Sequence, residues 1–170
     1  MTRHLIAAIV LSIMIHGNVR SQVSISAQAF AEVIEALTAY ETEQMNFGRF
    51  SPEMTGGNIV LSPDGTRSAQ GTIILASGPH NPGRFTITGA PEAAFSIQLP
   101  PGQAVLEHQI TGNTMIVQEW VSDPPANAEA LTLPNGSRII SIGATLSVGP
   151  VEDNPVGLYA GTFELTFSYN

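Results

Sequence analysis

The C-terminal residues 161–170 alternate between apolar and polar side chains, and this pattern constrains the fold more than any other part of the chain. Apolar residues occupy every odd position from Phe163 to Tyr169, and Thr, Glu or Ser fill the positions between them. Successive side chains of a β-strand point to opposite faces, so the alternation predicts a strand with one buried face. Such a strand needs a sheet, built by earlier segments, to cover its apolar row.

Similar stretches recur along the chain between clusters of Gly, Pro, Asn and Asp. This spacing is typical of a β-sandwich or barrel. Pro63 and Gly65 predict a tight turn at residues 62–66. We interpret residues 89–93 and 149–157 as hairpin loops and expect the two longest strands to pair with each other. The eight expected strands cover residues 58–61, 72–76, 84–88, 94–99, 103–110, 114–121, 138–148 and 158–169.

The N-terminus has the pattern of a signal peptide. Arg3 and His4 precede an apolar stretch over residues 5–15, and small and polar residues follow up to Gln22. This stretch is shorter than the ~20 apolar residues that a transmembrane helix needs. We expect cleavage after Ser21, which would leave residues 22–170 as a single exported domain in the periplasm, at the cell surface or outside the cell.

Composition excludes several partners and sites. The chain has a formal net charge of −8 and contains no Lys, so nucleic acid and anionic membranes are unfavourable partners. It has no Cys, which excludes disulfides, zinc–thiolate sites and a thiol nucleophile. We therefore expect no cofactor, no membrane span in the mature chain and only noncovalent assembly.

Residues 23–45 fit both a strand and a helix. Phe30, Val33, Ile34 and Leu37 would form one stripe of a helix, and Ala and Glu favour a helix from about Ala29. In a strand, one face would instead carry an apolar row that only Glu35 interrupts. The members of this row are Val23, Ile25, Ala27, Ala29, Ala31, Val33 and Leu37.

The chain contains six short motifs, at residues 45–48, 61–67, 85–89, 95–100, 143–149 and 157–163. Taken together and in order, these motifs resemble the secreted bacterial proteins grouped as domain of unknown function 4402. The resemblance implies an exported, immunoglobulin-like or pilin-like antiparallel β-sandwich without an established enzymatic activity. It also implies a strand-like segment before the Asn-Phe-Gly motif, so we interpret residues 23–45 mainly as a long or broken strand.

Candidate catalytic residues are few. Outside the predicted signal peptide the His residues are His80, in a Gly- and Pro-rich stretch, and His108, in a predicted strand. Neither has the acid and nucleophile partners of a catalytic triad in a recognisable motif. We interpret His80 as a loop residue and His108 as a surface or sheet-edge residue. The acidic stretch Glu152-Asp153-Asn154 lacks the alternating oxygen ligands of a calcium loop and is interpreted as a solvated loop.

Two further questions stay open from the sequence. Trp120 could be a platform for a sugar ring, or a core residue of the sandwich. The apolar row from Val23 to Leu37 could add as a strand to a neighbouring domain, or pack as the first strand of its own domain. We therefore expect a non-enzymatic surface or fimbrial-type subunit that assembles with itself or with other surface subunits. The alternative is a secreted monomeric binding module for glycans.

Overall fold

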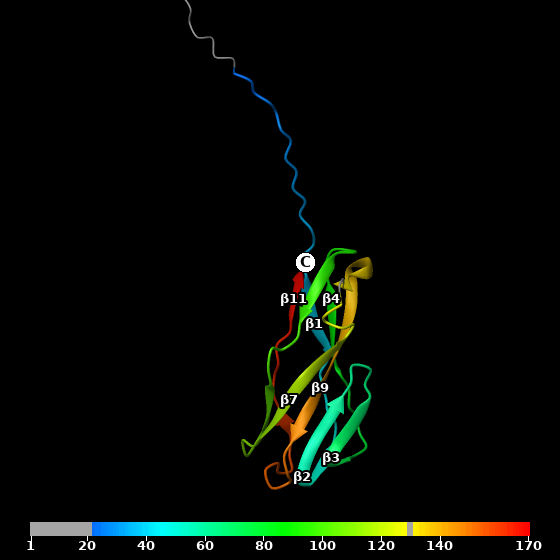
Figure 1. Cartoon of the computed structure of the whole chain (residues 1–170). Coiled ribbons are helices and arrows are strands. Elements are labelled where there is room, and N and C mark those ends of the chain that lie inside the picture. Colours follow the sequence, from blue (N-terminus) through cyan, green and yellow to red (C-terminus); the bar gives the residue numbers. More distant parts are fainter. Residues whose placement is uncertain (1–21, 129–130) are drawn as a thin grey trace, which may run out of the picture. The chain divides into compact units, whose positions relative to one another are not determined.

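The computed structural model describes residues 22–128 and 131–170 (Figure 1). The predicted signal peptide lies outside these residues. The predicted all-β class is confirmed, because the described residues form antiparallel strands and one short 3-10 turn, Pro134–Gly136. The strands are β1 (Thr38–Glu43), β2 (Phe50–Leu61), β3 (Arg67–Leu75), β4 (Gly83–Thr88), β5 (Ala94–Gln98), β6 (Ala104–His108), β7 (Thr114–Asp123), β8 (Leu131–Thr132), β9 (Ser137–Val148), β10 (Tyr159–Ala160) and β11 (Thr166–Tyr169).

The strands form a larger and a smaller antiparallel sheet, as in a sandwich. The larger sheet has the order β1-β4-β9-β7-β6-β10, with the β2–β3 hairpin joined to β9. The smaller sheet has the order β11-β5-β8. Strands β1, β4 and β11 lie at one end of the domain and β2 and β3 at the other, with β7 and β9 between them (Figure 1).

Strand β9 is the centre of the larger sheet. One of its edges pairs with β4 and then with β2, and the other pairs with β7. The predicted inward row of this strand is confirmed by its burial. Each member of the row is at most 3% exposed, and the row comprises Ile140, Ile142, Ala144, Leu146 and Val148.

The predicted pairing of the two longest strands is wrong. Both edges of β9 are already occupied, and the C-terminal stretch divides into β10, which pairs with β6, and β11, which pairs with β5. Residues 149–157 are therefore not a hairpin loop. Residues 89–93 also do not close a hairpin, since β4 lies in the larger sheet and β5 in the smaller one.

The predicted turn at residues 62–66 is confirmed and closes the β2–β3 hairpin. The N–H of Gly65 donates to the carbonyl of Ser62 over 2.9 Å, and Gly65 has a φ of +90°. The Asp64 carboxylate accepts from the N–H of Thr66 over 2.8 Å. This contact favours the charged form of the carboxyl and lowers the pKa of Asp64 below its ordinary value.

The long strand predicted over residues 23–45 is wrong for most of its length. Regular pairing begins at Thr38, where β1 pairs with β4, and residues 22–37 have neither strand nor helix structure. The compact unit comprises residues 34–170, and residues 22–33 lie outside it. An apolar row therefore does not by itself make a strand, because pairing also requires a sheet edge within reach.

Two clusters of buried side chains form the core. In the cluster near β11, residues of both sheets meet; it comprises Ile87, Phe95, Ile97, Leu131, Leu133, Ile140 and Ile142. In the cluster near the β2–β3 hairpin, every buried member except Phe47 comes from the larger sheet; it comprises Phe47, Ile59, Leu61, Met115, Val117, Ala144, Leu146 and Val148. We call the first the two-sheet cluster and the second the one-sheet cluster.

Candidate functional site

An open groove of about 1120 Å³ lies over the one-sheet cluster. Its walls come from two separate segments, residues 43–52 before and into β2 and residues 154–163 around β10. Its floor is apolar and is formed by inward-facing side chains of three strands. These are Ala104 and Leu106 of β6, Met115 and Val117 of β7, and Leu146 of β9.

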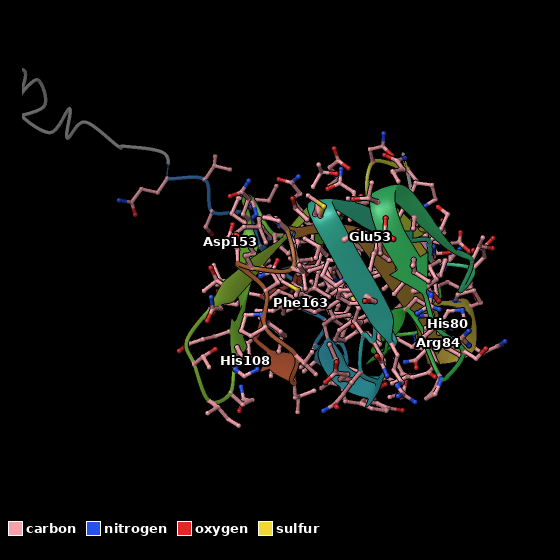
Figure 2. All side chains as sticks on the ribbon, turned by 90° about the horizontal axis from the view of Figure 1, so that it is seen from below. Glu53, His80, Arg84, His108, Asp153 and Phe163 are labelled. Carbon is pink, nitrogen blue, oxygen red and sulfur yellow. The ribbon has the colours of Figure 1, made fainter. Side chains whose placement is uncertain are left out.

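The groove lies between the two end strands of the larger sheet. Strands β1 and β10 are the first and last in the order of that sheet, and Glu41 and Glu43 of β1 and Tyr159 and Ala160 of β10 all line the groove. Figure 2 looks at the domain from the hairpin end, with Phe163 labelled among the interior side chains. An additional strand in this position would therefore join both ends of one sheet.

The inner face of β1 is uncovered. Ala39 of β1 pairs with Ile87 of β4, and paired residues of neighbouring strands point to the same face of a sheet. Ile87 is completely buried, yet Ala39 is exposed. A second hollow of about 210 Å³ lies beside it, between β1 and the apolar row of Phe163, Leu165 and Phe167. Phe163 lines both hollows.

The C-terminal wall of the groove has unpaired backbone. The β6–β10 ladder ends at Ala160 and the β5–β11 ladder begins at Thr166, so residues 161–165 lie outside both ladders. Side-chain burial nevertheless alternates through this stretch as it does in β11. The stretch therefore resembles a strand that lacks a partner, and its N–H and C=O groups can pair with an added chain.

Trp120 lies at the junction of the two core clusters and contacts both. A β-bulge between Gln118 and Val121, with Glu119 at a φ of +54°, shifts the alternation of β7 and turns the indole inward. The ring centre lies 4.7 Å from that of Phe163, and Nε1–H donates to the carbonyl of Gly102 over 2.9 Å. Trp120 is half-buried and lines the groove, so the sequence-based core interpretation describes its contacts better than an outward-facing platform does.

The prediction that His108 is a surface or sheet-edge residue is wrong, since its side chain is buried against Tyr159 and the residue is paired with β10. Nδ1 accepts from the N–H groups of Ile110 and Thr111, which assigns the ring proton to Nε2. Nε2 then donates to the carbonyl of Val156 over 3.2 Å. The ring therefore fastens the C-terminal wall of the groove to β6, and both ring nitrogens are occupied by structural contacts.

Tyr159 supports the same wall from inside the groove. Its hydroxyl donates to the carbonyl of Pro155 over 2.9 Å. Burial raises the pKa of Tyr159, and a hydrogen bond with Asn154 opposes the rise. The segment that borders the groove is thus held by side-chain contacts from both His108 and Tyr159, in addition to the short β6–β10 ladder.

The other predicted candidates lie apart from the groove floor. His80 is in an exposed loop, as predicted. Across the part of the chain that the structure describes, no group of three or more His, Cys, Asp and Glu side chains could hold a metal ion, including at residues 152–154. No helix in the same residues is long and apolar enough to cross a membrane.

The predicted assembly row of residues 23–37 is mostly exposed. Val23 and Ile25 are both 91% exposed and Val33 is 96% exposed, and Ala27, Ala29 and Ala31 are also exposed. Leu37 differs, because it is half-buried and packs against the two-sheet cluster. Close to it, the Tyr169 hydroxyl donates to the carbonyl of Glu35 over 2.9 Å. Residues 35 and 37 are therefore fixed to the domain.

The groove itself was not predicted from the sequence. Its walls come from segments more than a hundred residues apart, so no local pattern could indicate it. The one available signal was the unusual length of the apolar alternation at residues 158–169, which extends past the residues that find a partner.

Comparison with known proteins identifies one family. The family model described as Domain of unknown function (DUF4402) matches residues 37–169. No curated protein matches the chain. The match begins at Leu37, next to the first paired residue of β1, so residues 22–36 precede the matched region.

Proposed function

The chain belongs to the DUF4402 family, and from this premise we propose that it is an exported, non-enzymatic structural subunit that assembles noncovalently by strand addition. The carrying observation is the open apolar groove between β1 and β10, the two ends of one sheet. Added strands are recognised by backbone hydrogen bonds at a sheet edge and by pockets for alternate side chains. The groove offers the free edge of β1 and an apolar floor for one face of such a strand.

The groove favours a strand over a compact ligand because of its shape and chemistry. Free backbone edges border the groove at β1 and at residues 161–163, and its floor is a row of aliphatic side chains. Exposed strand edges and exposed apolar surface both promote association with another chain. An added strand would cover both at once.

The N-terminal row is the expected donor. Small and aliphatic residues occupy its alternate positions from Val23 to Val33, and Ser24, Ser26 and Gln28 occupy the other face. In an added strand the face with the apolar row would meet the aliphatic floor, and the face with Ser24, Ser26 and Gln28 would point to solvent. Export, as the predicted signal peptide implies, would place such a subunit at a cell surface or in a fimbria-like assembly.

Trp120 provides a direct measurement of groove occupancy, because it is the single Trp of the chain and lines the groove. We expect its emission to shift to shorter wavelengths as the mature protein is concentrated and large species appear in size-exclusion chromatography. Ala29→Asp places a charge on the apolar row and should prevent both changes, since burying an unpaired charge is costly. Gln28→Asp is the matched control, because it places the same charge on the opposite face and should preserve both changes.

Equal behaviour of the two variants would contradict strand addition, because only a strand distinguishes positions 28 and 29 by face. A protein that stays monomeric at every concentration, with unchanged Trp120 emission, would instead support the monomeric binding module.

A further inference from the structure

We propose that the groove of one copy holds residues 23–33 of a second copy, and that the contacts run head to tail, which produces an open-ended chain of subunits. This inference rests on the proposed function and deepens it by naming the occupant of the groove and the direction of assembly. Four observations carry it: the length of the donor, its charge, the fixation of its base and the position of that base relative to the groove.

Donor and wall are similar in length. Residues 23–33 lie outside the compact unit, and residues 154–163 form the C-terminal wall of the larger hollow. The donor therefore has eleven residues and the wall has ten, and an extended chain advances ~3.3 Å per residue. One donor segment can therefore run along this wall, and its aliphatic row can cover the floor.

The charges of the two partners are compatible. Residues 22–31 carry no charged side chain, and Glu32 is the first acid of the donor. Arg49 lines the groove, and within the described residues the one ion pair joins Arg84 to Glu43 and does not involve Arg49. Glu41 and Glu43 also line the groove, and Glu43 is paired with Arg84. The uncharged stretch brings no further acid beside them, and Arg49 can pair with Glu32.

The base of the donor is fixed in a way that keeps it from its own groove. Leu37 is packed into the two-sheet cluster, and the carbonyl of Glu35 is bound by Tyr169. To lie along the free edge of β1, the donor would have to reverse direction within residues 34–37. That stretch reads Ile-Glu-Ala-Leu and contains no Gly, Pro, Asn or Asp, the residues on which tight turns depend.

The base of the donor and the larger hollow lie toward different ends of the domain. The base contacts Tyr169 of β11, at one end, whereas the larger hollow lies over the one-sheet cluster toward the β2–β3 hairpin (Figure 1). With base and hollow at different ends, the base of one copy can face the larger hollow of a copy placed end to end with it, and this contact repeats without closing. A reciprocal pair would instead have to lie side by side and antiparallel, and it would stop at a dimer.

The absence of Cys in the natural chain allows a clean cross-linking test. Ala160→Cys places a thiol on the β10 wall, and Ala27→Cys, Ala29→Cys or Ala31→Cys places a second thiol on the donor row of the same chain. Three donor positions in the middle of the row are used so that three registers are tested. The concentrated mature double variants are treated with a short bis-maleimide and separated by denaturing electrophoresis.

We expect a ladder of covalent multimers from at least one double variant. The matched control combines Ala29→Cys with Ala128→Cys, a residue that is exposed in the loop after β7 and does not line the groove. It should give no ladder. A ladder of equal intensity in this control would overturn the inference.

The remaining outcomes separate the two proposals. An internally linked monomer, or a dimer without larger species, would overturn the head-to-tail inference. If no variant cross-links, a synthetic peptide of residues 22–34 is added to Ala29→Asp protein. A shift of Trp120 emission would then show that the groove accepts an added strand although the copies do not join head to tail, which overturns the inference alone. No shift would overturn the proposed function as well.

Discussion

The two ends of the domain use the same larger sheet but complete it differently. At the β11 end the smaller sheet lies over it, and Phe95, Leu133 and Ile140 are at most 1% exposed. At the hairpin end no second sheet of the described residues covers the one-sheet cluster, and Leu106, Trp120 and Tyr159 remain half-buried around a groove. The larger sheet is therefore covered at one end and open at the other, and the open end is where we propose that a strand is added.

The largest expected effect tests this comparison directly. Leu133→Ala removes a fully buried side chain from the two-sheet cluster and should lower the free energy of unfolding by about 3 kcal/mol. Leu106→Ala removes a half-buried side chain from the groove floor and should cost about 1 kcal/mol, because less buried surface is lost. Urea unfolding of both variants in an Ala29→Asp background would give the two values without a contribution from assembly. Equal losses of unfolding free energy in the two variants would mean that the hairpin end is as well covered as the β11 end.

A second prediction concerns the junction between the two ends. Trp120→Ala removes the contact with Phe163 and the hydrogen bond to Gly102, and we expect it to cost about 2 kcal/mol. Urea unfolding, followed by circular dichroism, measures the loss. A glycan array probed with the same variant tests the alternative, in which Trp120 binds a sugar. Unchanged stability together with lost glycan binding would make the indole a ligand platform.

A third and smaller effect is expected at the β11 end. Tyr169→Phe removes the hydroxyl that accepts from the N–H of Ala90 and donates to the carbonyl of Glu35. We expect a loss of about 1 kcal/mol in thermal unfolding. Tyr40→Phe, at an exposed site of β1, is the matched control and should change the stability by less. If both variants behave alike, residue 35 is not fixed as the structure shows.

The smallest expected effect lies in the hairpin turn. The pKa of Asp64 is lowered mainly by the backbone N–H of Thr66, so its stabilising contribution is present at neutral pH and is lost as the pH falls through the folded-state value. The difference in melting temperature between the natural protein and Asp64→Ala should therefore shrink on acidification from pH 7 towards pH 3. Asp64→Asn keeps an acceptor without a charge, and its own contribution should not vary with pH. A difference that grows in acid would contradict the assigned sign.

Local patterns predicted the strands well because their alternation is strong. The inward row of β9 and the turn at Gly65 both follow from the sequence alone. The pairing did not follow, since alternation identifies a face but does not choose a partner. Strand β9 and the C-terminal stretch share the same alternation, which led to the prediction that they pair. They cannot pair, because β2, β4 and β7 already occupy both edges of β9.

Residues 23–43 also show that a strand pattern does not determine which residues pair. The apolar row from Val23 to Val33 is a better strand pattern than β1, whose sequence is Thr-Ala-Tyr-Glu-Thr-Glu. Strand β1 nevertheless forms, because β4 lies beside it, while residues 22–33 remain without a ladder. The inward turn of Trp120 also had no local signal, because a positive φ at a Glu is set by the surrounding sheet.

The separation of the donor base from the larger hollow has a consequence for growth. Under the head-to-tail contact proposed above, a filament would have chemically distinct tips: one terminal subunit would keep a vacant groove, and the other would keep an unplaced N-terminal tail. A soluble peptide with the sequence of residues 22–34 would seal the first tip and leave the second active. Trace amounts of it should therefore limit filament length while leaving subunits already incorporated undisturbed.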